Sequence, residues 1–370
     1  MLKWITRASA WFGLAMVLFL ISMKSLPAMA AFHSAITADE THEFTWTKTA
    51  SPVTANLNAV EMVSALDGWA AGESGTLLHY DGKNWISESI PVTLTVTALS
   101  MSSVDNGWAL ASDTTQSTPS RTFLHWNGNK WQTVSGPSPA WPSYYRDISV
   151  PNDSSAWVAG GILVCSGSPP GCIPEYALGT ISHWDGSVWS STQIDHVTLS
   201  SISMVNDKEG WAVGTEVDPT THEQRSAIWR WNGTIWSSEA HPTIVYPAGE
   251  IHYILEEVAT LDSTNAWAAV TSLNTFLRWN GSVWSLVNSS VGGRPAIAIN
   301  SPSDAWGVGD LGVIVHWDGK SWERVESPVG DVLTGISMSS VSEGWAIGRG
   351  GLILHGIGFQ SYLPHVSKVR

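Results

Sequence analysis

The sequence predicts an all-β fold, a seven-bladed β-propeller whose blades are four-stranded antiparallel sheets. The first observation is a short word, a Trp preceded by Gly or Ala and followed by small or apolar residues, which occurs seven times. Its tryptophans are separated by 39, 49, 54, 56, 39 and 39 residues. They are Trp69, Trp108, Trp157, Trp211, Trp267, Trp306 and Trp345. A repeat of this length that reads as four short strands is typical of a propeller blade.

A second word follows each of the first six copies. In it, Asp or Asn stands four residues before a Trp and is followed directly by Gly. The six pairs are Asp81 and Trp85, Asn127 and Trp131, Asp185 and Trp189, Asn232 and Trp236, Asn280 and Trp284, and Asp318 and Trp322. Asp-Gly and Asn-Gly tolerate positive φ, so this word predicts a tight hairpin between the third and fourth strands. The alternating run before each first word, such as residues 333–338, predicts the first strand.

The seventh repeat ends near His355 without its Asp-Gly hairpin and its fourth strand. A matching strand, residues 44–48, stands at the other end of the chain, before Ser51-Pro52. We therefore expect the N-terminal strand to join the last blade and close a ring over residues 44–356. Closure of the ring removes the open sheet edges that favour aggregation.

The termini differ in composition from the repeats. Residues 1–30 combine Lys3 and Arg7, an apolar run over residues 11–21 and the word Ala28-Met29-Ala30, which predicts a cleaved signal peptide. An uncleaved anchor is the other interpretation, although the run is short for a membrane span. Residues 31–43 are interpreted as a linker and residues 357–370 as a C-terminal tail. The predicted location is therefore secreted or extracytoplasmic, at the cell surface or in the periplasm.

Two cysteines, Cys165 and Cys172, flank a turn-rich insertion. Outside the cytoplasm such a pair usually forms a disulfide, which we expect here; two free thiols are the alternative. Two ligands do not make a metal site.

The composition is acidic and rich in tryptophan. The formal net charge is −14, only 14% of the residues are charged, and 23 are Trp. An acidic chain of this kind does not present the basic surface that nucleic acid requires, so no nucleic-acid partner is expected. No apolar run after residue 30 is long enough for a membrane helix, so no span is expected after signal cleavage. The recurring tryptophans are expected to form the contacts between blades.

The histidines do not indicate a catalytic or metal site. Five of them fall at one position of the predicted third strand, and Arg230 and Arg278 take that position in two other repeats. The five are His79, His125, His183, His316 and His355. A side chain repeated once per blade is expected to be structural. We therefore expect no metal and no cofactor. The carboxylates Asp147, Asp153 and Asp304 are interpreted as repeat-turn residues.

The Trp words and the Asp-Gly hairpins resemble those of the sialidase-type propeller superfamily, whose hairpins carry Asp-boxes. Within it they are most similar to the photosystem II assembly and stability factor propellers. This resemblance implies an exported seven-bladed scaffold that binds proteins. The Phe/Tyr-Arg-Ile-Pro word of sialidases is absent from the chain. We therefore expect no sialidase activity and, more broadly, no enzyme.

Most of the length variation falls on one predicted face, which carries the loops between the second and third strands and the linkers between blades. Loops on a rigid scaffold commonly carry function. The long ones belong to blades 2, 3 and 4 and contain aromatic residues outside the repeat pattern. The candidate binding residues are Trp141, Tyr144, Tyr145, Arg146, Tyr246, His252 and Tyr253. The other interpretation is that these aromatics pack the long loops onto the blades.

The predicted function is an exported, non-catalytic scaffold that binds a protein partner through the long loops of one face. The alternative is a carbohydrate-binding module or a diverged glycosidase-like propeller, because flat aromatic rings also stack on sugars.

Overall fold

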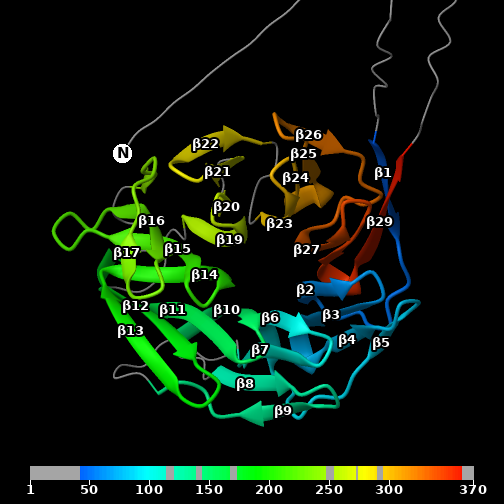
Figure 1. The fold of residues 1–370 in the computed structure, drawn as a ribbon, viewed down its shortest axis with the longest axis horizontal. Coiled ribbons are helices and arrows are strands. Elements are labelled where there is room, and N and C mark those ends of the chain that lie inside the picture. The colour runs from blue at the N-terminus through cyan, green and yellow to red at the C-terminus, as the bar shows by residue number, and fades with distance from the viewer. Residues whose placement is uncertain are drawn as a thin grey trace, which may run out of the picture. The chain divides into compact units, whose positions relative to one another are not determined.

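The structure is a computed structural model that describes residues 42–113, 121–138, 144–166, 173–246, 254–271, 274–289 and 295–360. These ranges form seven antiparallel sheets arranged around an axis (Figure 1). Six sheets have their strands in chain order, and the seventh has the order β1-β29-β28-β27. The predicted seven-bladed propeller is thereby confirmed.

Each blade runs from an innermost to an outermost strand. Blades 1 to 3 are β2 (Leu57–Ser64), β3 (Asp67–Gly72), β4 (Leu77–Tyr80) and β5 (Trp85–Ser87); β6 (Thr95–Ser103), β7 (Asn106–Ser112), β8 (Arg121–Trp126) and β9 (Trp131–Val134); and β10 (Tyr144–Asn152), β11 (Ser155–Ser166), β12 (Ile173–Trp184) and β13 (Trp189–Asp195). Blades 4 and 5 are β14 (Val197–Asn206), β15 (Glu209–Val217), β16 (Gln224–Trp231) and β17 (Trp236–Ser238), with β18 (Val245–Tyr246) added beside β16; and β19 (Leu255–Asp262), β20 (Asn265–Val270), β21 (Thr275–Trp279) and β22 (Trp284–Asn288). Blades 6 and 7 are β23 (Ala296–Ser301), β24 (Asp304–Val308), β25 (Ile314–Trp317) and β26 (Trp322–Val325); and β27 (Leu333–Ser340), β28 (Glu343–Gly348), β29 (Ile353–Gln360) and β1 (His42–Lys48).

The Asp-Gly and Asn-Gly words form the predicted hairpins between the third and fourth strands. In the last of them, Asp318 Oδ1 accepts hydrogen bonds from the backbone N–H groups of Lys320 and Ser321, both at 2.8 Å. Gly319, in between, has φ of 93°, which favours glycine. The hydrogen bonds hold the pKa of the Asp318 carboxyl below its usual value. The same arrangement recurs in all six hairpins, with Asp81, Asn127, Asp185, Asn232 and Asn280.

The repeated histidines are structural, as predicted. The His355 ring stacks on Trp345 with centroids 4.1 Å apart, and its Nε2 lies 2.9 Å from Glu343 Oε1. Four other histidines occupy the same position beside the second-strand Trp: His79, His125, His183 and His316. Arg230 replaces the histidine in blade 4, where it lies over Trp211 and pairs with Glu209 at 2.8 Å.

Aromatic triads join neighbouring blades. The second-strand Trp of one blade inserts between the third- and fourth-strand aromatics of the next. Trp69 of blade 1, for example, contacts Trp126 and Trp131 of blade 2 at centroid distances of 4.9 and 5.4 Å. Aromatic pairs favour such edge-to-face and tilted packing, and the rings fill the wide outer part of each wedge-shaped interface.

The seventh interface is completed by the N-terminal strand. β1 lies beside β29 over its whole length, from His42 opposite Gln360 to Lys48 opposite Leu354 (Figure 1). The pair formed by β1 and β29 thus begins at residue 42 and ends at residue 360, beyond the expected limits of 44 and 356. Gly356 stands in β29 where other blades have a third-strand aromatic, and a Cβ there would lie only 2.4 Å from the Phe44 ring. Phe44 and Trp46 both contact Trp306 of blade 6, at 4.3 and 5.7 Å. One strand therefore supplies two aromatics of the last triad.

Removal of the Trp46 ring is predicted to open this closure. Trp46 is 4% exposed, so Trp46→Ala should lower the free energy of unfolding by about 3–5 kcal/mol, as expected for a buried aromatic. Thr45 is exposed on the same strand, and Thr45→Ala should change the value by less than about 0.5 kcal/mol. Denaturant unfolding followed by circular dichroism measures both. Equal stability of the two variants would show that β1 does not hold the ring closed.

Candidate functional site

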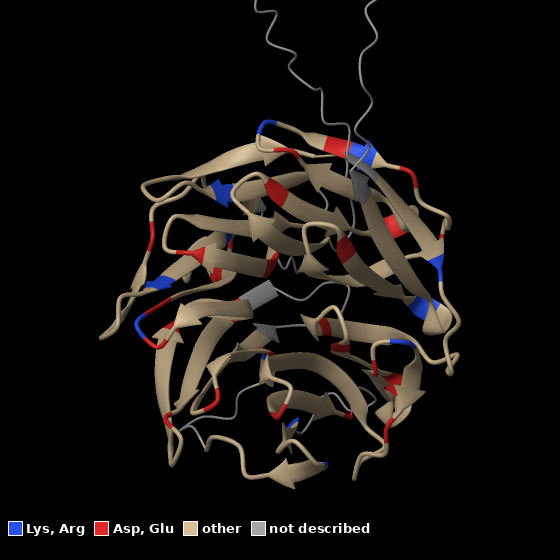
Figure 2. Cartoon of the chain, turned by 45° about the vertical axis from the view of Figure 1, so that its right-hand side comes forward, with Lys and Arg blue, Asp and Glu red and all other residues tan. Residues whose placement is uncertain are grey.

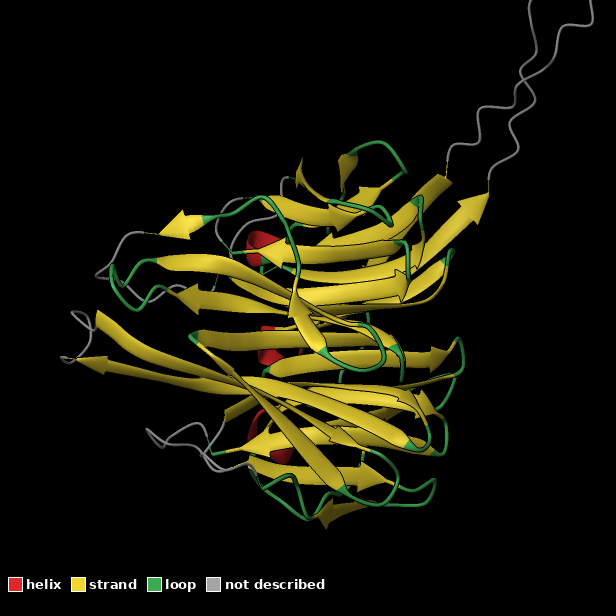
Figure 3. Cartoon of the chain, turned by 60° about the vertical axis from the view of Figure 1, so that its left-hand side comes forward, coloured by secondary structure: helices red, strands yellow, loops and turns green. Residues whose placement is uncertain are grey.

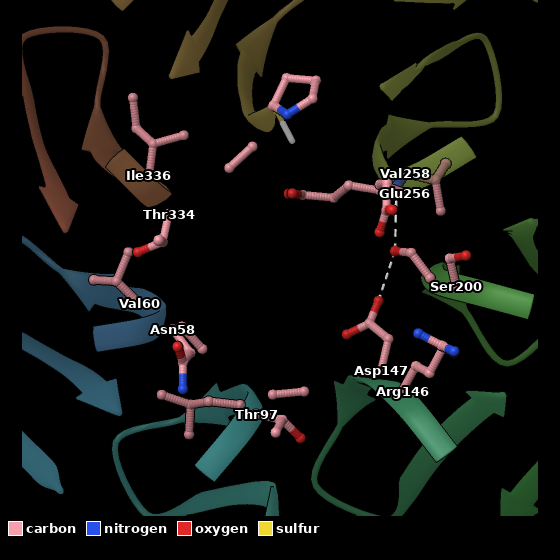
Figure 4. Close-up of a pocket in the computed structure, with 18 of the residues that line it drawn as sticks. Asn58, Val60, Thr97, Arg146, Asp147, Ser200, Glu256, Val258, Thr334 and Ile336 are labelled. Carbon is pink, nitrogen blue, oxygen red and sulfur yellow. Dashed lines mark hydrogen bonds between the residues drawn. The ribbon is translucent and has the colours of Figure 1, made fainter. Parts of the chain in front are cut away.

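The innermost strands of all seven blades surround a cavity of about 590 Å³ on the propeller axis (Figure 4). Every blade contributes to its wall. The polar and charged lining residues are Asn58, Thr97, Arg121, Arg146, Asp147, Ser200, Ser201, Glu256, Glu257 and Thr334, and the others are small or aliphatic. The volume lies within the range of pockets that hold small ligands.

The innermost strand is a sheet edge, so some of its N–H groups have no acceptor within the blade. Side chains of the preceding blade accept several of them. Glu61, opposite Trp69 in the sheet, accepts a hydrogen bond from Met101 N in blade 2 at 2.9 Å. At the equivalent position, Ser100 accepts from Val150 N in blade 3 at 3.1 Å. Ser149 and Ser337 act in the same way toward Met204 N and Met62 N.

A second set of such contacts links blades 3 to 6 (Figure 4). Asp147 Oδ2 accepts from Ile202 N at 2.9 Å and from the Ser201 hydroxyl at 2.6 Å. Ser201 Oγ in turn accepts from Val258 N at 3.1 Å. Glu257 Oε1 then accepts from Ile297 N at 3.3 Å. Blades 6, 7, 1 and 2 have Ala or Gly at the first-strand position equivalent to Asp147. These residues are Ala296, Gly335, Ala59 and Ala98.

A third set of residues lies where each innermost strand begins, on the face that carries the long loops. In six blades the sheet register shifts by one residue here, and the extra residue lines the cavity. These residues are Asn58, Thr97, Arg146, Ser200, Glu256 and Thr334. Arg121, the first residue of β8, joins them from the same face. The mouth of the cavity on this face therefore carries two guanidinium groups and a carboxylate.

Burial shifts the pKa values of Glu61, Asp147, Glu257 and Arg121 toward the neutral forms of their side chains. Desolvation raises the pKa of Glu61 and that of Glu257 to about 8 each, and the charge of Asp147 adds to both shifts. Desolvation also raises the pKa of Asp147, although three hydrogen bonds to its carboxylate act in the opposite direction. Desolvation and then the charge of Arg146 lower the pKa of Arg121 to about 10.

Of the seven predicted binding residues, the side chains of three are described, and all three belong to β10. Arg146 lines the cavity, and Tyr144 is half-buried at the start of β10. Tyr145 is buried inside blade 3, where its side chain is 3% exposed and its hydroxyl lies 2.7 Å from Ser182 Oγ. Trp141, His252 and Tyr253 lie outside the described residues. Of Tyr246, only the backbone is described, in β18 opposite Gln224.

The predicted disulfide also remains untested. Cys172 and the side chain of Cys165 lie outside the described residues, as do residues 1–30 of the predicted signal peptide. The backbone at Cys165 belongs to β11 and pairs with Pro174 of β12.

The cavity carboxylates were not singled out by the sequence pattern. Asp147 faces the axis and is not a turn residue, whereas Asp304 does lie in the repeat, where its Oδ1 lies 2.8 Å from His316 Nε2. A signal was present in retrospect. Glu61 and Glu257 interrupt first-strand positions that hold Ser, Ala or Gly in most other blades. Arg121 gave no signal, because it follows a loop of irregular length.

No three His, Cys, Asp or Glu side chains among the described residues are grouped so that they could hold a metal ion. No helix within the described ranges is long and apolar enough to cross a membrane.

Comparisons with known proteins support the fold. No protein-family model and no curated protein sequence matches the chain. Similar solved structures include YCF48 bound to D1 peptide, with 18% identity over 84% of this chain and 94% of that one and a TM-score of 0.58. YCF48 from Cyanidioschyzon merolae covers 84% of this chain and 98% of its own at 16% identity, with a TM-score of 0.56. The resemblance to photosystem II assembly propellers is thus confirmed for the fold.

An enzyme also shares the architecture. Streptogramin B lyase is 11% identical over 85% of this chain and 98% of its own, with a TM-score of 0.59. At such identities the similarity establishes the propeller and not the chemistry.

The buried carboxyl groups predict a loss of stability at alkaline pH. Their folded pKa of about 8 exceeds the unfolded value of 4.5, so their contribution is complete below about pH 4.5 and is lost as pH rises through 8. The free energy of unfolding, measured by thermal unfolding, should fall by several kcal/mol between about pH 5 and pH 9, since each unit of pKa shift corresponds to about 1.4 kcal/mol. Glu61→Gln keeps an acceptor for Met101 N and should flatten this profile.

The matched control is Glu88→Gln, because Glu88 is exposed. It should leave the profile of the wild-type protein unchanged. A Glu61→Gln profile as steep as that of the wild type would mean that Glu61 is ionised throughout.

Proposed function

We propose that this chain is an exported, non-catalytic scaffold that binds a protein partner on the long-loop face of blades 3 and 4. The observation that carries the proposal is the asymmetry of that face. In blades 1, 6 and 7, short connections that contain a three-residue 3₁₀ helix join the second and third strands: Glu73–Gly75, Asp310–Gly312 and Arg349–Gly351. In blade 3 the same strands, β11 and β12, each extend over 12 residues.

On the long-loop face, some strands project beyond the strands of the other blades, and we call this the raised part of the face (Figure 3). β10 begins opposite Gly161 of β11, so β11 continues past it to Ser166, paired with β12. In blade 4 the corresponding loop is held by Asp218, which accepts from Thr220 N and Thr221 N and pairs with Arg225 at 3.4 Å. Such a surface is pre-organised, which lowers the entropy cost of binding.

Apolar side chains are exposed on these projections. Val164 and Tyr176 face each other across the β11–β12 pair and are 46% and 37% exposed. Val245 of β18 is 49% exposed. Exposed apolar side chains on a rigid projection are typical of protein interfaces, and Tyr is a frequent anchor.

The similar YCF48 structure holds a peptide, which agrees with a protein partner for a propeller of this kind. Charge adds little attraction for a polyanion, since Lys and Arg are few and scattered along the described ribbon (Figure 2). The carbohydrate alternative needs flat exposed rings. Among the described aromatic residues, only Tyr176 has an exposed side chain, because the repeated tryptophans fill the blade interfaces.

Capture from the native extracellular fraction tests the proposal. The immobilised chain should retain a specific protein, and Val164→Asp with Tyr176→Ala should reduce the amount retained at least tenfold, because the apolar anchor is lost. Leu311→Ala is the matched control, since Leu311 is 77% exposed on the flat part of the same face. Quantitative mass spectrometry of the eluates measures both.

Retention that is equal in the wild type and the double variant would refute binding at blade 3. Reproducible binding on a glycan array without any retained protein would favour the carbohydrate alternative. Detection of the chain in the extracellular fraction, with its N-terminus at residue 31, tests the export part of the proposal.

A further inference from the structure

The face opposite the long loops carries exposed apolar side chains at regular places. This face, which we call the short-turn face, is formed by the turns between the first and second strands and the hairpins between the third and fourth strands (Figure 3). Six of the thirteen large apolar side chains that are exposed in the described ranges lie at the tips of these turns, each on a different blade. They are Leu66, Val104, Val188, Ile235, Val283 and Val341, which are between 48 and 68% exposed. Single exposed apolar side chains are common, but one on each of six blades is a pattern.

The two turns of each blade lie side by side, so these tips form one ring. A Cβ on Gly82, in the hairpin of blade 1, would lie 3.2 Å from the side chain of Leu66 in the first turn of that blade. In blade 5, a Cβ on Gly281 would lie 3.1 Å from the side chain of Thr264. The apolar tip belongs to the hairpin in blades 3, 4 and 5 and to the first turn in blades 7, 1 and 2. The first turn of blade 6 exposes Pro302, so every blade presents an apolar residue on this face.

Lysine occupies the hairpin tips that lack an aliphatic side chain. These residues are Lys83, Lys130 and Lys320 in blades 1, 2 and 6, and all three are exposed. Lysine is depleted from interfaces between proteins, whereas at a membrane its aliphatic stem lies along apolar surface while the ammonium group stays in water. A fluid bilayer also accepts separate apolar tips, for which a protein partner would need one pocket each. The combination of aliphatic and lysine tips therefore favours lipid over a second protein.

The described chain begins and ends at the short-turn face. His42 of β1 lies opposite Gln360 of β29, and Gly358 N donates a hydrogen bond to Ser342 O in the first turn of blade 7 at 2.8 Å. The apolar run over residues 11–21 precedes this point in the sequence. Both interpretations of that run, a signal peptide and an anchor, bring this end of the chain to a membrane.

We propose that the short-turn face lies on the surface of a phospholipid bilayer and inserts its apolar tips into the interface. The strength of such binding grows with the apolar area that is buried. The lipid surface is zwitterionic, because the same turns also expose carboxylates, among them Asp105, Asp153 and Asp207, which an anionic surface would repel. The long-loop face then points away from the membrane.

Amide hydrogen exchange of the full chain, with and without phosphatidylcholine vesicles, tests which face meets the lipid. Exchange in residues 185–188, 232–235 and 280–283 should slow severalfold when vesicles are added, because the bilayer excludes water from these hairpins. Exchange in the connections Glu73–Gly75 and Asp310–Gly312, on the long-loop face, should not change. The readout identifies the contact even where another part of the chain also holds it to the vesicle.

Vesicle flotation of two double variants tests the contribution of the tips. Ile235→Asp with Val283→Asp should weaken binding at least tenfold, because two apolar contacts are lost and two carboxylates face the headgroups. The matched control, Leu286→Asp with Leu311→Asp, changes the charge equally at side chains that are 50 and 77% exposed away from the short-turn face, and it should bind as the wild type does. Since all four positions are exposed, both variants should keep the melting temperature of the wild type.

Three results would overturn the proposal. One is slower exchange on the long-loop face alone or equally on both faces, and another is equal flotation of the two double variants. The third is a dimer in the absence of lipid that Ile235→Asp with Val283→Asp dissociates, which would assign the face to a second copy of the chain. The proposal does not depend on the scaffold role, since partner capture is tested at Val164 and Tyr176 on the opposite face.

Discussion

The contact of one tryptophan with the next blade is the interaction on which this structure depends. The seven second-strand tryptophans are between 0 and 6% exposed. Burial of such a ring is worth roughly 5 kcal/mol at 25 cal/mol/Å² before entropy is subtracted. Several of these rings, Trp69 and Trp211 among them, bury an Nε1–H group without a partner, which costs roughly 1–3 kcal/mol each. The burial term is larger, so the interfaces remain favourable.

Wide outer interfaces bring the inner strands close together around the axis. There is no further strand to accept the N–H groups on that edge, so side chains of the preceding blade do it. Ser is sufficient for this role, as Ser100 and Ser149 show. Glu61 and Glu257 have longer side chains, and desolvation raises the pKa of both carboxyl groups, of which that of Glu257 lines the cavity. The chemistry of the axis thus follows from the way the ring closes.

The architecture could be predicted because it rests on local, repeated signals. The hairpin words, the stacked histidines and the strand that completes the last blade all depend on residue types at fixed spacing. The site depends on details that spacing does not report. The register shift after Tyr145 is the clearest case: strict alternation would send Arg146 and Asp147 to opposite faces, whereas the extra residue lets both line the cavity. Arg121 lines the cavity from the first residue of β8, a third strand, which the repeat pattern places away from the axis.

The same register shift explains why the mouth and the axis differ in charge. Residues at the shift leave the ladder between strands and are free to vary, and they include both Arg146 and Glu256. Residues farther in must accept N–H groups, so they are hydroxyl or carboxyl side chains, or small ones where no acceptor is supplied. Among the described residues that line the cavity, the cations Arg121 and Arg146 therefore lie at the mouth. A ligand that approaches across the raised half of the face meets positive charge before it meets the carboxyl groups of the axis.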